Sequence, residues 1–305
     1  MPKGLLIPRG KQDPSGLWLT FDRKVAPRGW LQQRIPRWVP RVASSFGLLA
    51  GATCPGKTPF CDSCYGTKSE QGQGVSELLR HNTLLLRNAS EEHMYELLSD
   101  MMRKYRHDAQ LWRLAPRELI FRIHWDGDFF SEAYARAWAR VIRENPEVIF
   151  WVYTRSFVPS ANVAPILAGI PNLALYLSAD VWNVELARTV AAAYPGVLLA
   201  YCTVDYKTGR QLARAVRGRK VQVCPENDGR LPLMGGDETV TNGGRGACVS
   251  CMLCPDARCD IIFSTSHKYD ASAANHIRGQ GALFPIDTVP ITLGRKHTSD
   301  LADVI

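Results

Sequence analysis

Nine cysteines constrain this 305-residue chain more than any other feature, because they fall into groups. Cys54, Cys61 and Cys64 form the first group, and four cysteines from Cys248 to Cys259 form the second. Cys202 and Cys224 stand between them. The first residues lack the apolar stretch of a secretory signal, so we expect reduced thiols rather than a disulfide framework. Grouped cysteines in such a chain predict metal binding or redox chemistry.

The composition excludes a mainly disordered chain, because 46% of the residues are hydrophobic and 22% are charged, as in ordinary globular proteins. No run approaches the roughly 18–20 consecutive apolar residues that cross a bilayer. We therefore expect a soluble, cytoplasmic protein with no membrane partner.

The net charge of +8 is concentrated in two regions. Residues 1–41 hold nine Lys or Arg against two Asp. Such regions can contact nucleic acid or other anions, although a solvated arm and a solvated helix face are the plainer alternative. The second region comprises Lys207, Arg210, Arg214, Arg217, Arg219 and Lys220.

Short apolar runs rich in branched and aromatic residues predict buried parallel strands. Between them, amphipathic segments predict helices, most clearly over 131–144, where Ser131 can cap the N-terminus. The other expected helices cover 75–106 (two, broken near Asn88–Ser90), 160–169, 183–194 and 208–217. The expected strands are Val42–Leu49, Leu119–Trp125, Val148–Thr154, Leu173–Ser178, Val197–Thr203 and Val221–Cys224.

Six strand-then-helix units in series predict an α/β fold with a parallel sheet. Nearly every expected strand ends in polar residues, as a β/α barrel requires for its active site, whereas an open sheet collects such groups mainly at one switch point. We therefore expect a partial (β/α)6 barrel of the TIM type over residues 41–224. A basic N-terminal arm (1–40) precedes it, and a cysteine-rich C-terminal extension (225–305) follows it.

The first cysteine group lies on a Gly/Pro-rich loop, residues 54–64, directly after the first expected strand. Three thiolates within eleven residues can wrap one metal centre, and thiolates select zinc or iron–sulfur clusters. A [4Fe-4S] cluster held by three cysteines would leave one iron open to substrate or cofactor. The alternatives are a closed site completed by a distant cysteine such as Cys202, or buried free thiols.

The second group begins with the C-x2-C-x2-C run of Cys248, Cys251 and Cys254, the spacing of ferredoxin-type clusters. Its fourth ligand is expected to be Cys224, with Cys259 as the alternative. A zinc knuckle is the competing interpretation, although zinc sites usually pair C-x2-4-C units.

Polar residues at two strand ends are candidates for binding a cofactor. Asp126, Gly127 and Asp128 lie beside a helix N-terminus, where carboxylates can bind an amino group or a hard cation, or simply cap the helix. Arg155 could clamp a carboxylate or pair with an aspartate. His124 could contact a ligand or be a buried core histidine.

The architecture resembles the radical S-adenosylmethionine (SAM) superfamily, in which three cysteines after the first strand hold a [4Fe-4S] cluster and SAM occupies the open iron. The resemblance implies that Asp126-Gly127-Asp128 holds the SAM amino group, and that Cys224, Cys248, Cys251 and Cys254 hold an auxiliary cluster. The spacing here is C-x6-C-x2-C, where that superfamily usually has C-x3-C-x2-C.

Three segments of the sequence resemble those of a bacteriophage family, the gene-product-eighty-eight-like proteins. The matching segments are Cys54–Tyr65, Arg122–Ser131 and Phe150–Thr154. This resemblance implies a phage or prophage protein in a bacterial host cell and supplies no reaction.

Together these patterns predict an iron–sulfur protein with one or two [4Fe-4S] clusters, and SAM as a further cofactor if it is a radical SAM-like enzyme of undefined substrate. The alternative is a non-catalytic iron–sulfur or zinc phage protein that binds nucleic acid or a host factor through its basic arm.

Overall fold

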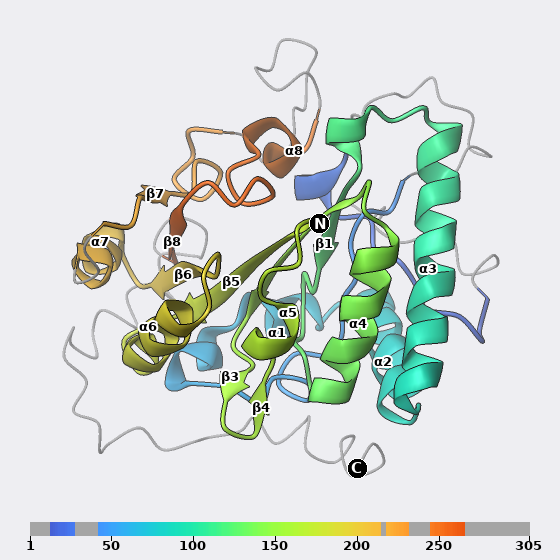
Figure 1. Cartoon of the computed structure of the whole chain (residues 1–305), viewed down its shortest axis with the longest axis horizontal. Helices are drawn as coiled ribbons and strands as arrows, with labels where there is room; N and C mark the ends of the chain where they lie inside the picture. The colour runs from blue at the N-terminus through green and yellow to red at the C-terminus, as the bar shows by residue number, and fades with distance from the viewer. Residues whose placement is uncertain (1–12, 28–41, 215–217, 232–244, 266–305) are drawn as a thin grey trace.

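A six-stranded parallel sheet forms the centre of the computed structural model, which describes residues 13–27, 42–214, 218–231 and 245–265 (Figure 1). The strands lie in the order β1-β2-β5-β6-β8-β7, and all their pairings are parallel, which confirms the α/β class. A short antiparallel pair, β3 and β4, follows β2. The bounds are β1 Ile120–Ile123, β2 Ile149–Thr154, β3 Phe157–Val158, β4 Ala161–Asn162, β5 Leu173–Ala179, β6 Leu198–Thr203, β7 Val221–Val223 and β8 Asp260–Ser264.

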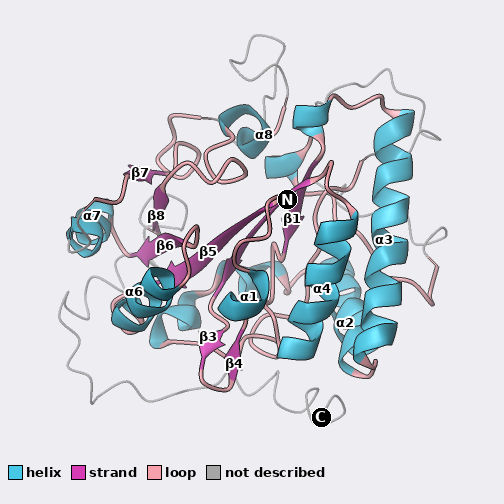
Figure 2. Ribbon diagram, in the orientation of Figure 1, coloured by secondary structure: helices cyan, strands magenta, loops and turns pink. Residues whose placement is uncertain are grey.

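The helices match most of the amphipathic segments (Figure 2). The break near residue 88 falls between α2 and α3, and Ser131 caps α4 by accepting a hydrogen bond from the Tyr134 N–H at 3.2 Å. Two short helices, α1 and α8, carry or adjoin cysteines and were not expected. The bounds are α1 Tyr65–Ser69, α2 Gln73–Arg87, α3 Glu91–Leu111, α4 Glu132–Glu144, α5 Ala164–Leu167, α6 Val184–Ala193, α7 Tyr206–Arg214 and α8 Ala247–Cys251.

The expected strand at 42–49 forms two isolated bridges instead, one parallel from Ser45 to Arg122 and one antiparallel from Ser45 to Thr20. It runs beside β1, with the Phe46 N–H donating to the Arg122 carbonyl at 3.2 Å. Backbone hydrogen bonds continue beyond this point, from the Trp125 N–H to the Phe46 carbonyl and from the Leu48 N–H to the Asp126 carbonyl, both at 2.9 Å. They do not form a regular ladder, because His124 has a left-handed backbone (φ 54°) directly after β1. A regular strand cannot continue past such a residue.

The cysteine-rich extension contributes β8, which lies between β6 and β7 and was not predicted. Its short apolar run, Ile261 to Phe263, was the available signal. Within the described residues, β1 and β7 form the two ends of the row and do not pair with each other. The parallel sheet is therefore established, and closure into a TIM-type barrel stays a prediction.

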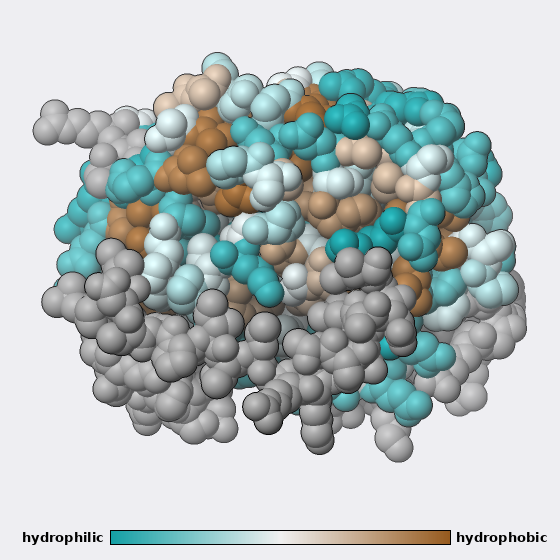
Figure 3. Space-filling model, turned by 90° about the horizontal axis from the view of Figure 1, so that it is seen from below, coloured by the Kyte–Doolittle hydropathy of each residue, from teal (hydrophilic) through white to brown (hydrophobic). Residues whose placement is uncertain are grey.

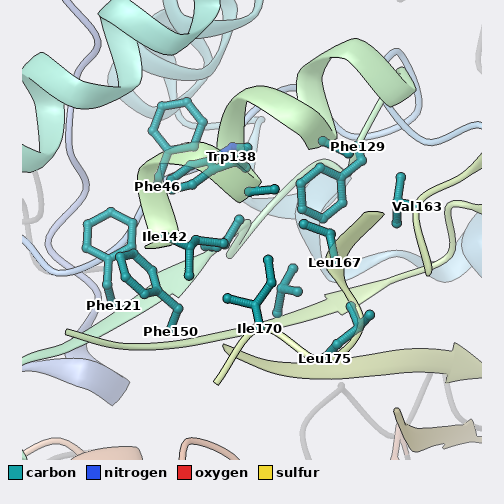
Figure 4. Close-up of a cluster of buried hydrophobic side chains, with 14 of the residues drawn as sticks. Phe46, Phe121, Phe129, Trp138, Ile142, Phe150, Val163, Leu167, Ile170 and Leu175 are labelled. Atoms are coloured by element: carbon teal, nitrogen blue, oxygen red, sulfur yellow. The ribbon is translucent and has the colours of Figure 1, made fainter. Parts of the chain in front are cut away.

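The two faces of the sheet pack against different partners. On one face, Phe121, Phe150 and Leu175 belong to the main core together with helix side chains such as Trp138 (Figure 4). The ring centroids of Phe121 and Trp138 are 6.2 Å apart. On the other face, Trp151, Tyr176 and their neighbours pack against the segment that includes α8 and Cys254. This alternation follows from the two-residue repeat of a strand.

The described part of the N-terminal arm, residues 13–27, packs onto this body. The Trp18 ring stacks on His81 with ring centroids 3.8 Å apart, and Val25 is fully buried. The rest of the expected arm lies outside the described residues. Seen from below, the side on which β3 and β4 lie in Figure 1 carries separate hydrophobic patches between hydrophilic residues (Figure 3).

We expect Asn172→Asp to lower the free energy of unfolding by about 2–4 kcal/mol, because the Asn172 amide donates to three carbonyls, those of Ile142, Asn145 and Val148. Asn162→Asp is the matched control, since Asn162 uses its oxygen to accept from the Ala164 N–H and keeps it. Urea denaturation measures both, and equal losses would contradict the donor role of Asn172.

Candidate metal centres

The loop that carries the first cysteine group lies on the carboxyl ends of the strands. A 3-10 turn, Pro59–Ser63, and helix α1 shape it around Cys61 and Cys64. Gly66 is required for its approach to β1, because an added Cβ would stand 2.0 Å from Asp126 Oδ1. Gly56 makes a similarly close approach, because an added Cβ there would stand 1.8 Å from the Arg155 carbonyl oxygen.

Asp128 fixes the junction between β1 and β2. Its carboxylate accepts from the Thr154 hydroxyl at 2.6 Å and from the Arg155 N–H at 2.7 Å. Its own N–H donates to the Thr53 hydroxyl on the cysteine loop at 3.1 Å. Burial raises the pKa of Asp128 to about 6, against the lowering effect of these hydrogen bonds. Asp128 thus positions the loop.

Asp126 presents an unsatisfied acceptor beside the same loop. Its Oδ1 accepts from the Gly127 N–H at 2.9 Å, and its Oδ2 is buried with no hydrogen-bond partner among the described residues. Burial first, and then the nearby Glu70, raise the pKa of Asp126 well above its usual value. A buried oxygen of this kind is suited to a hydrogen-bond donor or a cation.

Arg155 forms a buried ion pair with Asp180 at the carboxyl ends of β2 and β5, with Nη1 and Oδ2 2.5 Å apart. Thr58 on the cysteine loop joins this pair: its hydroxyl donates to Asp180 at 2.6 Å and lies 3.3 Å from Arg155 Nη1. The same hydroxyl lies 3.9 Å from Cys61 Sγ. Of the two alternatives for Arg155, the aspartate partner is the one observed.

The thiols of the first group lie within electrostatic reach of one another. Burial, then the Asp128 charge, raise the pKa of Cys54 well above its usual value, and Cys64 adds to this effect. Burial also raises the pKa of Cys64, with Asp126 and Cys61 contributing, against backbone hydrogen bonds from Gly66 and Thr67. Such thiols stay protonated until a cation offsets their charge.

The second group gathers on the sheet face opposite the helices. Cys224 follows β7 and is held by its N–H, which donates to the Ile262 carbonyl at 3.0 Å. Burial raises the pKa of Cys254 well above its usual value, and Cys248, Cys224 and Cys251 add to it. Gly246 allows the segment to approach, since an added Cβ would lie 2.4 Å from the Arg23 carbonyl.

Two polar side chains of the sheet face this second group. The Tyr153 hydroxyl hydrogen-bonds to the Cys254 thiol. Arg122 binds Asp22 at 2.8 Å and donates to the Tyr65 hydroxyl at 3.1 Å, next to the first group. It also lowers the pKa of Cys248, which burial raises to about 12. Arg122 therefore lies between the two cysteine groups.

His124 lies apart from these residues, in the aromatic core on the helix-covered face. Its Nε2 lies 2.9 Å from the Tyr134 hydroxyl, and its ring packs edge-on against Phe129. Burial lowers its pKa to about 3, so the imidazole is neutral. A ligand contact by His124 stays a prediction, whereas Asp126, Gly127, Asp128 and Arg155 do border the cysteine loop.

The sequence patterns select neither Thr58 nor Asp180, both of which contact Arg155 in the structure. All nine cysteines are described, and none forms a disulfide. Across the described ranges, no three His, Cys, Asp or Glu side chains are arranged so as to hold a metal ion as they stand. No helix of these ranges is long and apolar enough to cross a membrane.

Fold and site define a parallel α/β protein with two groups of thiols on one sheet. The chain belongs to the Gene product 88 family, whose model matches residues 19–257. It is 40% identical over 232 residues to the Gene 88 protein of Mycobacterium phage L5, which covers 74% of this chain and 89% of that relative. The Gene 88 protein of Mycobacterium phage D29 matches to the same extent. These relatives support a phage origin, and no solved structure matches the chain.

We expect Gly127→Ala to destabilise the protein by about 3 kcal/mol, since Gly127 has φ +74° and an added Cβ would lie 2.7 Å from the Leu48 Cβ. Gly169→Ala is the matched control, because Gly169 has φ +76° and nothing within 4 Å, so only about 1 kcal/mol of backbone strain is expected. Chemical denaturation compares them, and an equal loss would show that crowding at Gly127 is unimportant.

Proposed function

We propose that this phage protein binds iron–sulfur clusters through its two cysteine groups and uses them in redox chemistry. The observation that carries the proposal is the second group, in which Cys254 belongs to a buried cluster with Cys224 and Cys248 packed against it. Cys251 acts on the same thiol, because its charge also raises the pKa of Cys254. Three of the four belong to the C-x2-C-x2-C run typical of [4Fe-4S] sites. Cys224 raises the pKa of both the Cys248 and the Cys254 thiol, which favours Cys224 over Cys259 as the fourth ligand.

The chemistry of the donor set fits such a centre. Thiolates bind iron–sulfur clusters or zinc in preference to hard cations, and burial keeps these thiols protonated until a cation is present. The side chains must draw together as the centre is loaded, because metal binding and folding are coupled. Zinc remains the competing metal, and acid-labile sulfide separates the two.

A cluster would supply one-electron transfer, and the surrounding residues would tune it. The Tyr153 hydroxyl and the buried Arg122 are donors facing the second group, and donors to cluster sulfurs set the reduction potential. Cys251 borders a hollow of about 300 Å³ together with Arg117, Arg245 and Arg258. This opening gives the second group a route for exchange with solvent or a redox partner.

A radical SAM-like reaction is the alternative form of the proposal, and it applies only where three cysteines alone hold the first cluster. It requires an open coordination position at the first group and a site for the amino group of SAM. The unsatisfied Asp126 Oδ2 supports the second requirement. The substrate would be a small molecule or a macromolecule that enters at the same strand ends.

Metal analysis tests the proposal. We expect about eight iron and eight acid-labile sulfide per chain in protein purified without oxygen, as two cubanes require. Cys254→Ser should lower both to about four, since it removes one ligand from the second group. Zinc without sulfide in the wild-type protein would contradict the proposal. It would indicate instead a binding protein that structural zinc stabilises.

A second candidate function is nucleic-acid binding, favoured by one surface. Arg210 and Arg214 lie one turn apart on α7 and, with Arg230, line a hollow of about 600 Å³ beside the edge strand β7. Arg230 pairs with Asp228 at 2.6 Å within this hollow, and Arg219, from the same predicted basic cluster, pairs with Asp260 at 2.7 Å. Lysines and arginines without carboxylate partners are the side chains that neutralise phosphates.

We expect Arg214→Gln to weaken binding to mixed-sequence DNA or RNA and to reduce the slope of log affinity against log salt by about 1. Arg143→Gln, at an exposed arginine of α4, is the charge-matched control and should leave the slope unchanged. Titration at several salt concentrations measures both. An identical effect of the two variants would mean that only net charge matters.

A further inference from the structure

Cys202 lies at the carboxyl end of β6, beside the residues that hold the first cysteine loop. β5 and β6 pair in parallel with Ala179 opposite Tyr201, so the next residues, Asp180 and Cys202, lie side by side. Cys202 shares its side of β6 with Ala200, which packs on the sheet face opposite the helices.

Hydrogen bonds bring the cysteine loop to this point. Asp180 Oδ2 accepts from the Thr58 hydroxyl at 2.6 Å, and that hydroxyl lies 3.9 Å from Cys61 Sγ. Arg155 Nη1 contacts both Thr58 and Asp180. A short chain of contacts therefore connects the strand end that carries Cys202 to the loop that carries Cys61.

The charges agree with this placement. Burial raises the pKa of Cys202 to about 11; the Arg155 guanidinium opposes the shift, and Asp180, Cys61 and Cys64 add to it. Burial lowers the pKa of Arg155, and the charges of Cys202 and Cys61 are among those that raise it again. Cys61 and Cys202 thus both lie within electrostatic reach of the Arg155 guanidinium, and Cys64 lies within reach of Cys202.

We infer that Cys202 is the fourth thiolate ligand of the first centre, together with Cys54, Cys61 and Cys64. The inference rests on the proposed function, because it concerns the same centre. A cubane with four protein thiolates has no iron left open, so the first centre would transfer or store electrons and would not bind SAM. Arg155 would then neutralise part of the thiolate charge from within the sheet.

The test compares the full-length wild-type protein with Cys202→Ser and Cys259→Ser, all purified without oxygen. Iron, sulfide and the electron paramagnetic resonance spectrum of the reduced protein are measured. We expect Cys202→Ser to lose or alter the signal of one cluster, with iron falling from about eight toward about four per chain. Cys259→Ser removes another buried thiol and should keep both clusters.

Two results would overturn the assignment. One is a Cys202→Ser protein with wild-type iron, sulfide and spectrum. The other needs no variant: SAM added to the reduced wild-type protein should leave the spectrum unchanged, and a shifted cluster signal would reveal an open iron. Wild-type protein with no iron or sulfide would instead contradict the proposed function itself, so the two failures are distinct.

Discussion

The ion pair between Arg155 and Asp180 is the interaction on which the arrangement of the candidate site depends. Their side chains are 11% and 1% exposed, and a buried pair is strongly destabilising to break, because one charge is left without its partner. The pair joins the ends of β2 and β5 and supplies two of the contacts of the Thr58 hydroxyl. The loop with the first cysteines is thereby attached to the sheet at one defined place.

The two faces of the sheet carry side chains of different chemical character. The face beneath the helices is apolar apart from groups such as His124, whose burial keeps it neutral. By strand alternation the other face carries Arg122, Tyr153 and Cys202, and the segment around α8 packs against Tyr153 and its apolar neighbours there. The thiols of the second group are therefore packed against a rigid sheet rather than carried on an open tail, and this burial raises their pKa values.

Local patterns were sufficient for most elements, including α4 with its Ser131 cap and five of the six expected strands. The expected strand at 42–49 does not form a regular ladder, because the left-handed backbone of His124 interrupts its pairing with β1. An apolar run in a sequence does not reveal the φ of a single residue. The spacing of the cysteines predicted both groups. The contacts of Thr58 with Asp180, and the place of Cys202, depend on strand register and loop position, which no local pattern encodes.

Charge balance explains why arginines are buried on the sheet face that holds the thiols. Bringing several thiolates together in a protein interior is unfavourable unless nearby cations offset them. Arg155 lies within reach of Cys61 and Cys202, and Arg122 within reach of Cys248. Each cysteine group therefore has one guanidinium supplied by the sheet. A metal centre of the proposed kind would offset most of the remaining negative charge, and its binding would then be coupled to the folding of the site.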